Sequence, residues 1–208
     1  MAEHANSLTA SPDLSPQAWR KALRKQMKEA RNALAPEERA ERSARAVALL
    51  ADSPVFRAAR TVMLYDHVGG ELSLDSLLTH PAAAGKVFCY PLCVSRTDMI
   101  AMVPGGWEIG AYGIREPIRA LSREVPPEEI DLVVCPGTAF DPACYRMGMG
   151  GGYYDRYLPK CTSARVVMVA FELQRVERVP VEPWDRPMEQ VFTEARVYTR
   201  AQTPLKKG

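Results

Sequence analysis

The first apolar pattern along the chain has the period of an α-helix. Ser15 supplies a hydroxyl N-cap, and Pro16 follows at the first helical position. An apolar stripe then recurs at spacings of three and four residues: Trp19, Leu23, Met27, Ala30 and Leu34. A cationic stripe runs beside it: Arg20, Arg24, Lys28 and Arg31. A second helix is predicted from Pro36 to about Leu50, because the acidic residues after Pro36 suit the positive end of the helix dipole.

After Pro54 the pattern changes to short, continuous apolar runs, which indicate buried strands. The candidate strands are 61–65, 86–91, 98–103, 131–137 and 164–171, with an edge strand or hairpin over 191–199. Helical segments are predicted over 74–78, capped by Ser73, and from 153 to 158, whereas the glycine-rich segment 105–117 is expected to be a connection. Strands that alternate with helices predict an α/β layered domain. Its central sheet would be largely parallel and flanked by helices, with an N-terminal helical pair.

Length and composition are those of an ordinary globular domain. The chain has 208 residues, of which 47% are hydrophobic and 25% charged. We expect a flexible N-terminal tail over 1–15, a single α/β domain over 16–200 and a C-terminal tail over 201–208. No apolar run approaches the roughly 20 residues of a membrane span. The N-terminus lacks the basic start and apolar core of a secretory signal, so a cytoplasmic protein is expected.

Charge and cysteine content exclude two further classes of function. The net charge of +2 is too small to argue for nucleic-acid binding. The cysteine count of five is odd, and no C-x-x-C motif occurs, so free thiols are expected. Cys89 and Cys93 have no second pair nearby, and a structural zinc site is not expected.

The stretch DPACYRMGMGGGYYDRYL, residues 141–158, is the strongest candidate for chemistry. It follows the most apolar strand and precedes a predicted helix, which is where ligands bind in α/β folds. Glycine lets the main chain approach an anion without a Cβ in the way. Phosphate binding is one interpretation, and a turn packed tightly under Tyr153 and Tyr154 is the other. Neither the Walker A loop nor the dinucleotide motif fits, because Ala111 and Tyr153 occupy required lysine and glycine positions.

Two charged residues beside these glycines favour phosphate. The guanidinium of Arg146 suits a phosphate group, and it stands two residues before Gly148. Asp155 would repel a phosphate unless a cation lies between them, and Mg²⁺ commonly bridges one or two carboxylates to phosphate oxygens. The alternative for Asp155 is an ordinary acidic residue in the first turn of a helix.

The segment CPGTAFDPACYRMGMGGGYYDRYL resembles the signature of the 5-formyltetrahydrofolate cyclo-ligase family, also called methenyltetrahydrofolate synthetases. The similarity continues in RKALRKQMKEARNAL, GGELSLDSLL, YGIREP and FELQRVERVPVEPWDRPMEQVFTE, and covers about residues 18–196. The resemblance implies a small cytoplasmic α/β enzyme that uses ATP and Mg²⁺. It would convert 5-formyltetrahydrofolate to 5,10-methenyltetrahydrofolate as a monomer, with small-molecule partners and neither membrane nor nucleic acid.

The resemblance also assigns roles to residues. It implies an ATP-binding set of Arg20, Arg24, Arg146, Gly148, Gly150, Gly151, Gly152 and Tyr154. It implies that Glu71, Met149 and Tyr153 bind the folate, that Asp155 and Asp185 hold Mg²⁺, and that Arg146 and Asp155 are catalytic. Glu71 suits a pterin edge, which offers a ring N–H and an amino group side by side. From residue types alone the arginines could be a solvated cationic face, Glu71 a turn residue, and one tyrosine a core residue.

The sequence departs from the family pattern at several positions. Met149 stands where many relatives have an arginine or an aromatic residue, and Gly151 where some have lysine. The loop therefore holds no lysine, so neutralising the terminal phosphate falls to Arg20, Arg24, Arg146 and the metal. Three further positions bear on the site: Tyr112 near the folate entrance, Trp184 where a polar residue is usual, and Glu189 where aspartate is frequent.

Two rival functions stay open on the sequence. One is a non-catalytic relative that binds nucleotides or, through its basic helix, RNA. The presence of Glu71, Arg146 and Asp155 together argues against it, because a catalytically inactive copy is expected to lose at least one of them. The other is an ATP-dependent ligase acting on a different amide, which only substrate assays distinguish.

Overall fold

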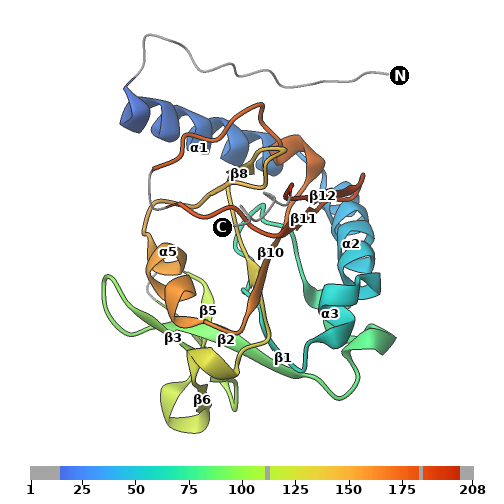
Figure 1. Cartoon of the computed structure of the whole chain (residues 1–208), viewed down its shortest axis with the longest axis vertical. Coiled ribbons are helices and arrows are strands. Elements are labelled where there is room, and N and C mark those ends of the chain that lie inside the picture. The colour runs from blue at the N-terminus through green and yellow to red at the C-terminus, as the bar shows by residue number, and fades with distance from the viewer. Residues whose placement is uncertain (1–14, 111–112, 183–184, 202–208) are drawn as a thin grey trace, which may run out of the picture.

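The centre of the fold is a mixed sheet (Figure 1), seen in a computed structural model that describes residues 15–110, 113–182 and 185–201. The described strands lie in the order β12 (Val197–Thr199), β11 (Gln190–Phe192), β10 (Arg165–Val169), β7 (Leu132–Cys135), β1 (Thr61–Met63), β2 (Val87–Cys93), β3 (Met99–Val103) and β6 (Arg123–Val125). The strands from β11 to β2 are parallel, whereas β12, β3 and β6 pair antiparallel at the two edges. The predicted α/β fold with a largely parallel sheet is confirmed.

Serine caps begin α1 (Pro16–Asn32) and α3 (Pro54–Ala58), whereas α2 (Pro36–Asp52) and α4 (Asp75–Leu78) have no side-chain cap. The helix α1 starts after Ser15, whose hydroxyl accepts the N–H of Ala18 at 3.3 Å. The helix α2 carries two acidic residues in its first turn. A short helix that the sequence did not predict, α3, follows because the Ser53 hydroxyl caps the N–H of Phe56 at 3.2 Å. The helix α4 begins one residue later than predicted, with Leu74 and not Ser73 at its N-cap, although the Ser73 hydroxyl accepts the N–H of Asp75 at 3.1 Å.

The sheet is covered on both faces. Alternate residues of β1 and β7 point to opposite sides: Val62, Leu132 and Val134 join the core formed with α2 and α3, and Met63, Val133 and Cys135 join the core formed with α5 (Tyr153–Tyr157). Figure 1 shows α2 and α3 on one side of the strands and α5 on the other. Burial on both faces explains why the strands are continuous apolar runs.

Several short elements differ from the expectation. The segment 105–117, predicted as a connection, contains the hairpin of β4 (Trp107–Ile109) and β5 (Arg115–Pro117). The two-residue strands β8 (Ala139–Phe140) and β9 (Arg146–Met147) pair before the glycines. The 3-10 helices are η1 (Pro81–Ala83), η2 (Arg119–Leu121), η3 (Pro127–Glu129), η4 (Leu158–Lys160) and η5 (Glu172–Gln174).

Some expectations lie outside the described residues: those for most of the two tails, for Tyr112 and for Trp184. All five cysteines are described and are free thiols, as expected. No helix in the described ranges combines the length and apolarity that crossing a membrane requires.

Candidate active site

The candidate site lies at the carboxyl ends of three neighbouring parallel strands. β1, β7 and β10 are adjacent, so the loops that follow them emerge side by side. The loop after β1 carries Glu71, the segment after β7 leads to Gly148, and the segment after β10 leads to Asp185. This topology brings together residues that lie far apart in the sequence.

The helix α1 lies across these loops. Its buried Leu23 and Met27 pack on four residues from the loops: Ala139, Met147, Val176 and Val179. Arg20, Arg24 and Arg31 share one face of the helix, because spacings of four and eleven residues return to nearly the same direction. Each of the three contacts a different loop. The three arginines of the cationic stripe are therefore not the solvated face that composition allowed, whereas Lys28 is exposed.

Arg20 holds the segment after β10. Its Nη1 lies 2.6 Å from Glu182 Oε1, and its Nε and Nη2 donate to the carbonyl of Pro180. Asp185 Oδ2 lies 4.0 Å from Arg20 Nη2 and accepts the N–H of Glu182 at 2.8 Å. Arg20 and Asp185, both predicted site residues, are therefore neighbours.

Arg24 holds the glycine loop, which we define as residues 148–152. Its Nε donates to the carbonyl of Gly148 at 2.9 Å. A Cβ on Gly150, whose φ is +106°, would lie 3.3 Å from the guanidinium carbon of Arg24. Burial, and secondarily the charge of Arg20, lowers the pKa of Arg24. Arg24 thus places a cation beside bare main chain, which favours a bound anion.

The main-chain amides of the glycine loop are available to a ligand. The carbonyls of Gly148 and Gly151 accept from Arg24 and Arg156. None of the N–H groups of residues 148–152 donates a hydrogen bond to another described residue. Successive free amides with glycines at positive φ, here Gly150 and Gly152, form the concave arrangement that binds phosphates.

The positive φ of Gly152 provides a test of this loop. With φ at +68°, alanine there is strained, and its Cβ would lie 2.6 Å from Arg156 Nη1. Displacing Arg156 would release the Gly151 carbonyl that it holds. We expect Gly152→Ala to lower kcat/KM for ATP by about tenfold or more, a typical cost of misplacing a positioning group.

Gly85→Ala is the matched control for this substitution. Gly85 has φ of +75°, and a Cβ added there would have no neighbour within 4 Å, so the variant carries a similar backbone strain without displacing a side chain. Both variants are expected to lose about 1 kcal/mol of folding free energy, but only Gly152→Ala should change ATP kinetics. Unchanged ATP kinetics in Gly152→Ala would contradict the assigned role of the loop.

Arg146 and Asp155 flank the glycine loop and contact each other. Arg146 Nη2 lies 2.6 Å from Asp155 Oδ1, with side chains that are 5% and 50% exposed respectively. The guanidinium lies over the ring of Tyr154 at 5.6 Å, and its Nε is buried without a hydrogen-bond partner in the described structure. Arg146 thus has unused donor capacity beside the free amides.

Tyr154 lies between the glycine loop and Glu71. Its hydroxyl is buried without a hydrogen-bond partner among the described residues. Burial raises its pKa strongly, with smaller effects of Cys135, Arg146, Tyr65 and Glu71. The hydroxyl is therefore a neutral donor at physiological pH.

Helix α5 contributes less to phosphate attraction than the sequence suggested. The prediction relied on a helix N-terminus after the glycines, but α5 has five residues and no side-chain cap. So short a helix has a small dipole, and the amides and arginines must supply most of the attraction for phosphate.

The loop's outer side is joined to the turn between β2 and β3. Tyr153 donates its hydroxyl to the Ser95 carbonyl at 3.1 Å, and Arg156 donates to the Thr97 carbonyl at 2.7 Å. Arg156 also lies over the Tyr153 ring. Met149 is 58% exposed, with its sulfur 3.3 Å from the Thr138 hydroxyl. Met149 thus lies at the surface of the loop, whereas Tyr153 is partly buried and packs against the core on the α5 side of the sheet.

Glu71 is buried in the neighbouring loop. It is 8% exposed, its Oε2 accepts the N–H of Val68 at 3.2 Å, and its Oε1 lies 3.7 Å from Arg31 Nη1. Burial raises the pKa of Glu71, whereas Arg31, the Val68 N–H and His67 lower it. Glu71 lines a small pocket with Arg31, Tyr65, Gly137 and Gln174, and its burial shows that it is not a solvated turn residue.

Comparison with known proteins decides the family. The family model described as the 5-formyltetrahydrofolate cyclo-ligase family matches residues 16–194. The chain belongs to the 5-formyltetrahydrofolate cyclo-ligase family. The chain is 29% identical over 179 residues to the 5-formyltetrahydrofolate cyclo-ligase of Escherichia coli (strain K12), covering 83% of this chain and 98% of that protein.

Solved structures agree with this assignment. The NMR structure of 5,10-methenyltetrahydrofolate synthetase from Aquifex aeolicus matches with a TM-score of 0.76 and 31% identity, covering 90% of this chain and 98% of that one. A 5,10-methenyltetrahydrofolate synthetase from Mycoplasma pneumoniae matches with a TM-score of 0.69 and 23% identity, covering 84% and 98%, and supports the fold alone.

The acidic residues of this cyclo-ligase fit the Mg²⁺ that the family resemblance implies only together with a nucleotide. Asp155 is half exposed and Asp185 lies beside Arg20. In the described part of the chain no group of three His, Cys, Asp or Glu side chains could hold a metal by itself. Mg²⁺ usually takes one or two carboxylates and completes its shell with water and phosphate oxygens. The residues present suit that mode.

Two residues that contact the predicted site residues were not predicted from the sequence. Arg156 holds the Gly151 carbonyl, and Arg31 contacts Glu71. The available signal for Arg31 was its place on the face shared with Arg20 and Arg24. Glu189, in contrast, pairs with Arg165 at the amino ends of the strands. The candidate site lies at their carboxyl ends, so Glu189 lies outside it.

Proposed function

We propose that this enzyme transfers the terminal phosphoryl group of ATP to the formyl oxygen of 5-formyltetrahydrofolate at the glycine loop. Family membership across residues 16–194 gives the overall reaction, the conversion of 5-formyltetrahydrofolate to 5,10-methenyltetrahydrofolate with ATP. The observation that carries the proposed location is the set of free amides at residues 148–152, flanked by Arg146 and Asp155.

The chemistry explains why phosphate is needed. A formamide carbonyl is a poor electrophile, and its oxygen is a poor leaving group. Phosphorylation of the oxygen releases ADP and leaves an iminium carbon that N10 attacks. The bond between carbon and the phosphorylated oxygen then breaks, phosphate departs, and N10 loses its proton as the ring closes. No nucleophilic side chain is required, so the protein acts by positioning and charge stabilisation.

The described residues suit these tasks. The amides of the loop and Arg146 would bind the terminal phosphate, while Arg24 keeps the loop in place through the Gly148 carbonyl. Asp155 and Asp185 would hold Mg²⁺, which neutralises phosphate charge when bound. Glu71 would accept from the pterin edge, and Tyr153 and Met149 would contact the folate from the outer side of the loop.

A coupled assay tests the proposed function. The enzyme mixed with ATP, Mg²⁺ and 5-formyltetrahydrofolate should form methenyl product and ADP in equal amounts, followed by methenyl absorbance and ADP release in one sample. Methenyl formation without ATP, or ADP release that another formamide supports equally well, would contradict it.

The contacts of α1 also bear on whether the protein binds RNA. The RNA-binding alternative relies on the basic residues of α1. Arg20, Arg24 and Arg31 are turned into the loops and at least half buried, which leaves the exposed Lys21, Lys25 and Lys28 for such a contact. We propose a cytoplasmic monomer with ATP and the folate as its partners. Size-exclusion chromatography with light scattering checks the monomer, and salt-sensitive retention on RNA would support the rival instead.

A further inference from the structure

Arg31 is a buried cation that the proposed mechanism does not use. It is 4% exposed at the last turn of α1. Its Nε is buried without a hydrogen-bond partner in the described structure, and its Nη1 reaches the Gly137 carbonyl only at 3.5 Å. A guanidinium so poorly satisfied costs free energy to bury, so its position calls for another explanation than stability.

The Gly137 turn does not need Arg31. Gln174 Nε2 donates to the Gly137 carbonyl at 2.8 Å and to the Thr138 carbonyl at 2.9 Å. These bonds already hold the turn, and the contact from Arg31 is longer than either. Within the described residues, the acidic group that Arg31 contacts is Glu71, with 3.7 Å between Nη1 and Oε1.

The loop that carries Glu71 is packed directly on the end of α1. A Cβ on Gly70 would lie 2.4 Å from Asn32 Oδ1 and 3.2 Å from the main-chain carbon of Arg31. A side chain at this position would displace the Asn32 side chain and push the helix end away by a few tenths of an ångström. The packing of this loop on the helix end therefore places the Glu71 carboxylate beside the Arg31 guanidinium.

We infer that Arg31 is a positioning residue for folate binding, which keeps Glu71 ionised and correctly placed to accept from the pterin edge. The inference rests on the proposed role of Glu71. A protonated Glu71 would present a hydroxyl and lose half of its acceptor function, and a pterin edge with two adjacent donors would then bind more weakly. Arg31 acts through Glu71 and need not touch the folate itself.

The charges around Glu71 agree with this role. Burial raises the pKa of Glu71, and Arg31 is the largest influence that lowers it, ahead of the Val68 N–H and His67. Tyr65 and Tyr154 are the other titratable groups that interact with Glu71, and both hydroxyls have pKa values raised by burial, so they are neutral. Removing Arg31 should therefore raise the pKa of Glu71 further.

The test measures the dissociation constant of 5-formyltetrahydrofolate from about pH 5.5 to 9 in variants of the full chain. Binding needs the carboxylate, so affinity is lost as pH falls through the pKa of Glu71. In Arg31→Met this loss should occur at higher pH, with affinity about tenfold or more weaker at pH 7 and partly recovered at pH 9. Arg31→Lys should restore most of the wild-type profile, while the affinity for ATP stays unchanged in both.

Two further variants keep the outcomes distinct. Arg31→Met combined with Glu71→Gln removes both charges, so it should regain thermal stability lost by Arg31→Met without regaining folate affinity. If the pair of Arg31 and Glu71 had a purely structural role, thermal stability and folate affinity would return together in the double variant, and that result would overturn the inference. An unshifted pH profile in a folded Arg31→Met would also overturn it. Wild-type folate affinity in Glu71→Gln alone would instead show that the proposed role of Glu71 is wrong. His67 is common to all these variants, so it does not cause differences between them.

Discussion

Replacing Arg146 by methionine should lower kcat about a thousandfold while the protein stays folded. The loop has no lysine, and Arg146 stands beside the free amides of residues 148–152 with an Nε that has no partner among the described residues. Removing a charge that stabilises a transferring phosphoryl group typically costs a factor of 10² to 10⁵. Methionine keeps most of the packing on Tyr154, over which the guanidinium lies. Steady-state kinetics with saturating ATP and folate measure the loss.

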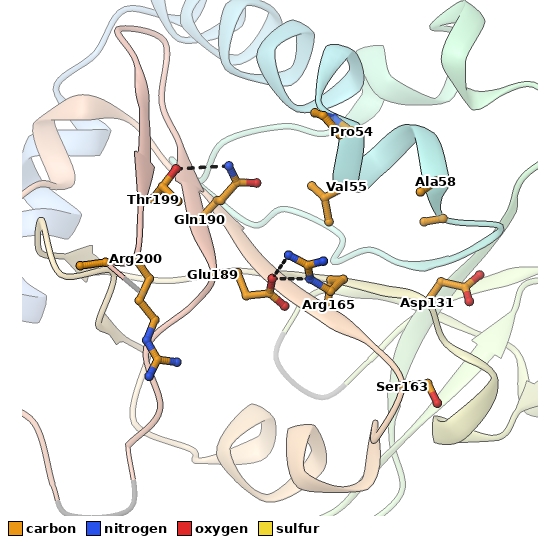
Figure 2. Close-up of a pocket in the computed structure, with 12 residues that line it drawn as sticks. Pro54, Val55, Ala58, Asp131, Ser163, Arg165, Glu189, Gln190, Thr199 and Arg200 are labelled. Atoms are coloured by element: carbon orange, nitrogen blue, oxygen red, sulfur yellow. Dashed lines mark hydrogen bonds and ion pairs between the residues drawn. The ribbon is translucent and has the colours of Figure 1, made fainter. Parts of the chain in front are cut away.

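Arg165→Met is the matched control. Arg165 also pairs with a carboxylate, that of Glu189, but at the amino ends of the strands, beside a hollow that it lines with Asp131 and Arg200 (Figure 2). This variant also loses an ion pair at the end of the sheet, yet it should keep kcat within about twofold, as a surface pair contributes little. Equal losses in the two variants would show that Arg146 acts through stability and not through the reaction.

Asp155→Asn should lower kcat about a hundredfold and raise the Mg²⁺ concentration needed for half-maximal rate. The carboxylate is half exposed, and asparagine keeps an oxygen that can accept from Arg146 Nη2, so the variant is expected to stay folded. The loss in rate follows if Asp155 holds the cation that bridges to the phosphate. A titration of rate against Mg²⁺, with thermal unfolding measured on the same samples, separates the two effects.

Glu189→Gln is the control for this second substitution, because it removes an equally charged partner of an arginine at the amino ends of the strands. It should leave both kcat and the Mg²⁺ requirement unchanged. If Asp155→Asn turned over normally at low Mg²⁺, the metal role of Asp155 would be wrong, and its contact with Arg146 would be only an ion pair.

The sheet was predictable from sequence because its strands are buried on both faces. The sequences of β7 and β10 are continuous apolar runs, and such runs are typical of strands that are buried on both faces. The hairpin of β4 and β5 was not predictable, because its strands are three residues long and largely exposed, and the pairing is set by tertiary contacts such as Arg115 with Asp66. The helix α3 was not predictable either, because it depends on a single hydroxyl cap.

The candidate site was predictable as a set of residues but not as a set of contacts. The glycines and Arg146 could be read from one short stretch, whereas the ion pair of Arg146 with Asp155 required the loop to fold back. Arg31 illustrates the limit. Periodicity placed it in a cationic stripe, but its burial against Glu71 follows from Gly70, which lets a distant loop reach the end of α1.

A crystal structure with Mg²⁺ and a non-hydrolysable ATP analogue tests the proposed phosphate site most directly. Oxygens of the terminal phosphate should accept from main-chain amides within residues 148–152 and from Arg146, with Asp155 facing the cation. A nucleotide bound away from residues 146–155, for example in the hollow near Arg165 and Arg200 (Figure 2), would contradict that placement.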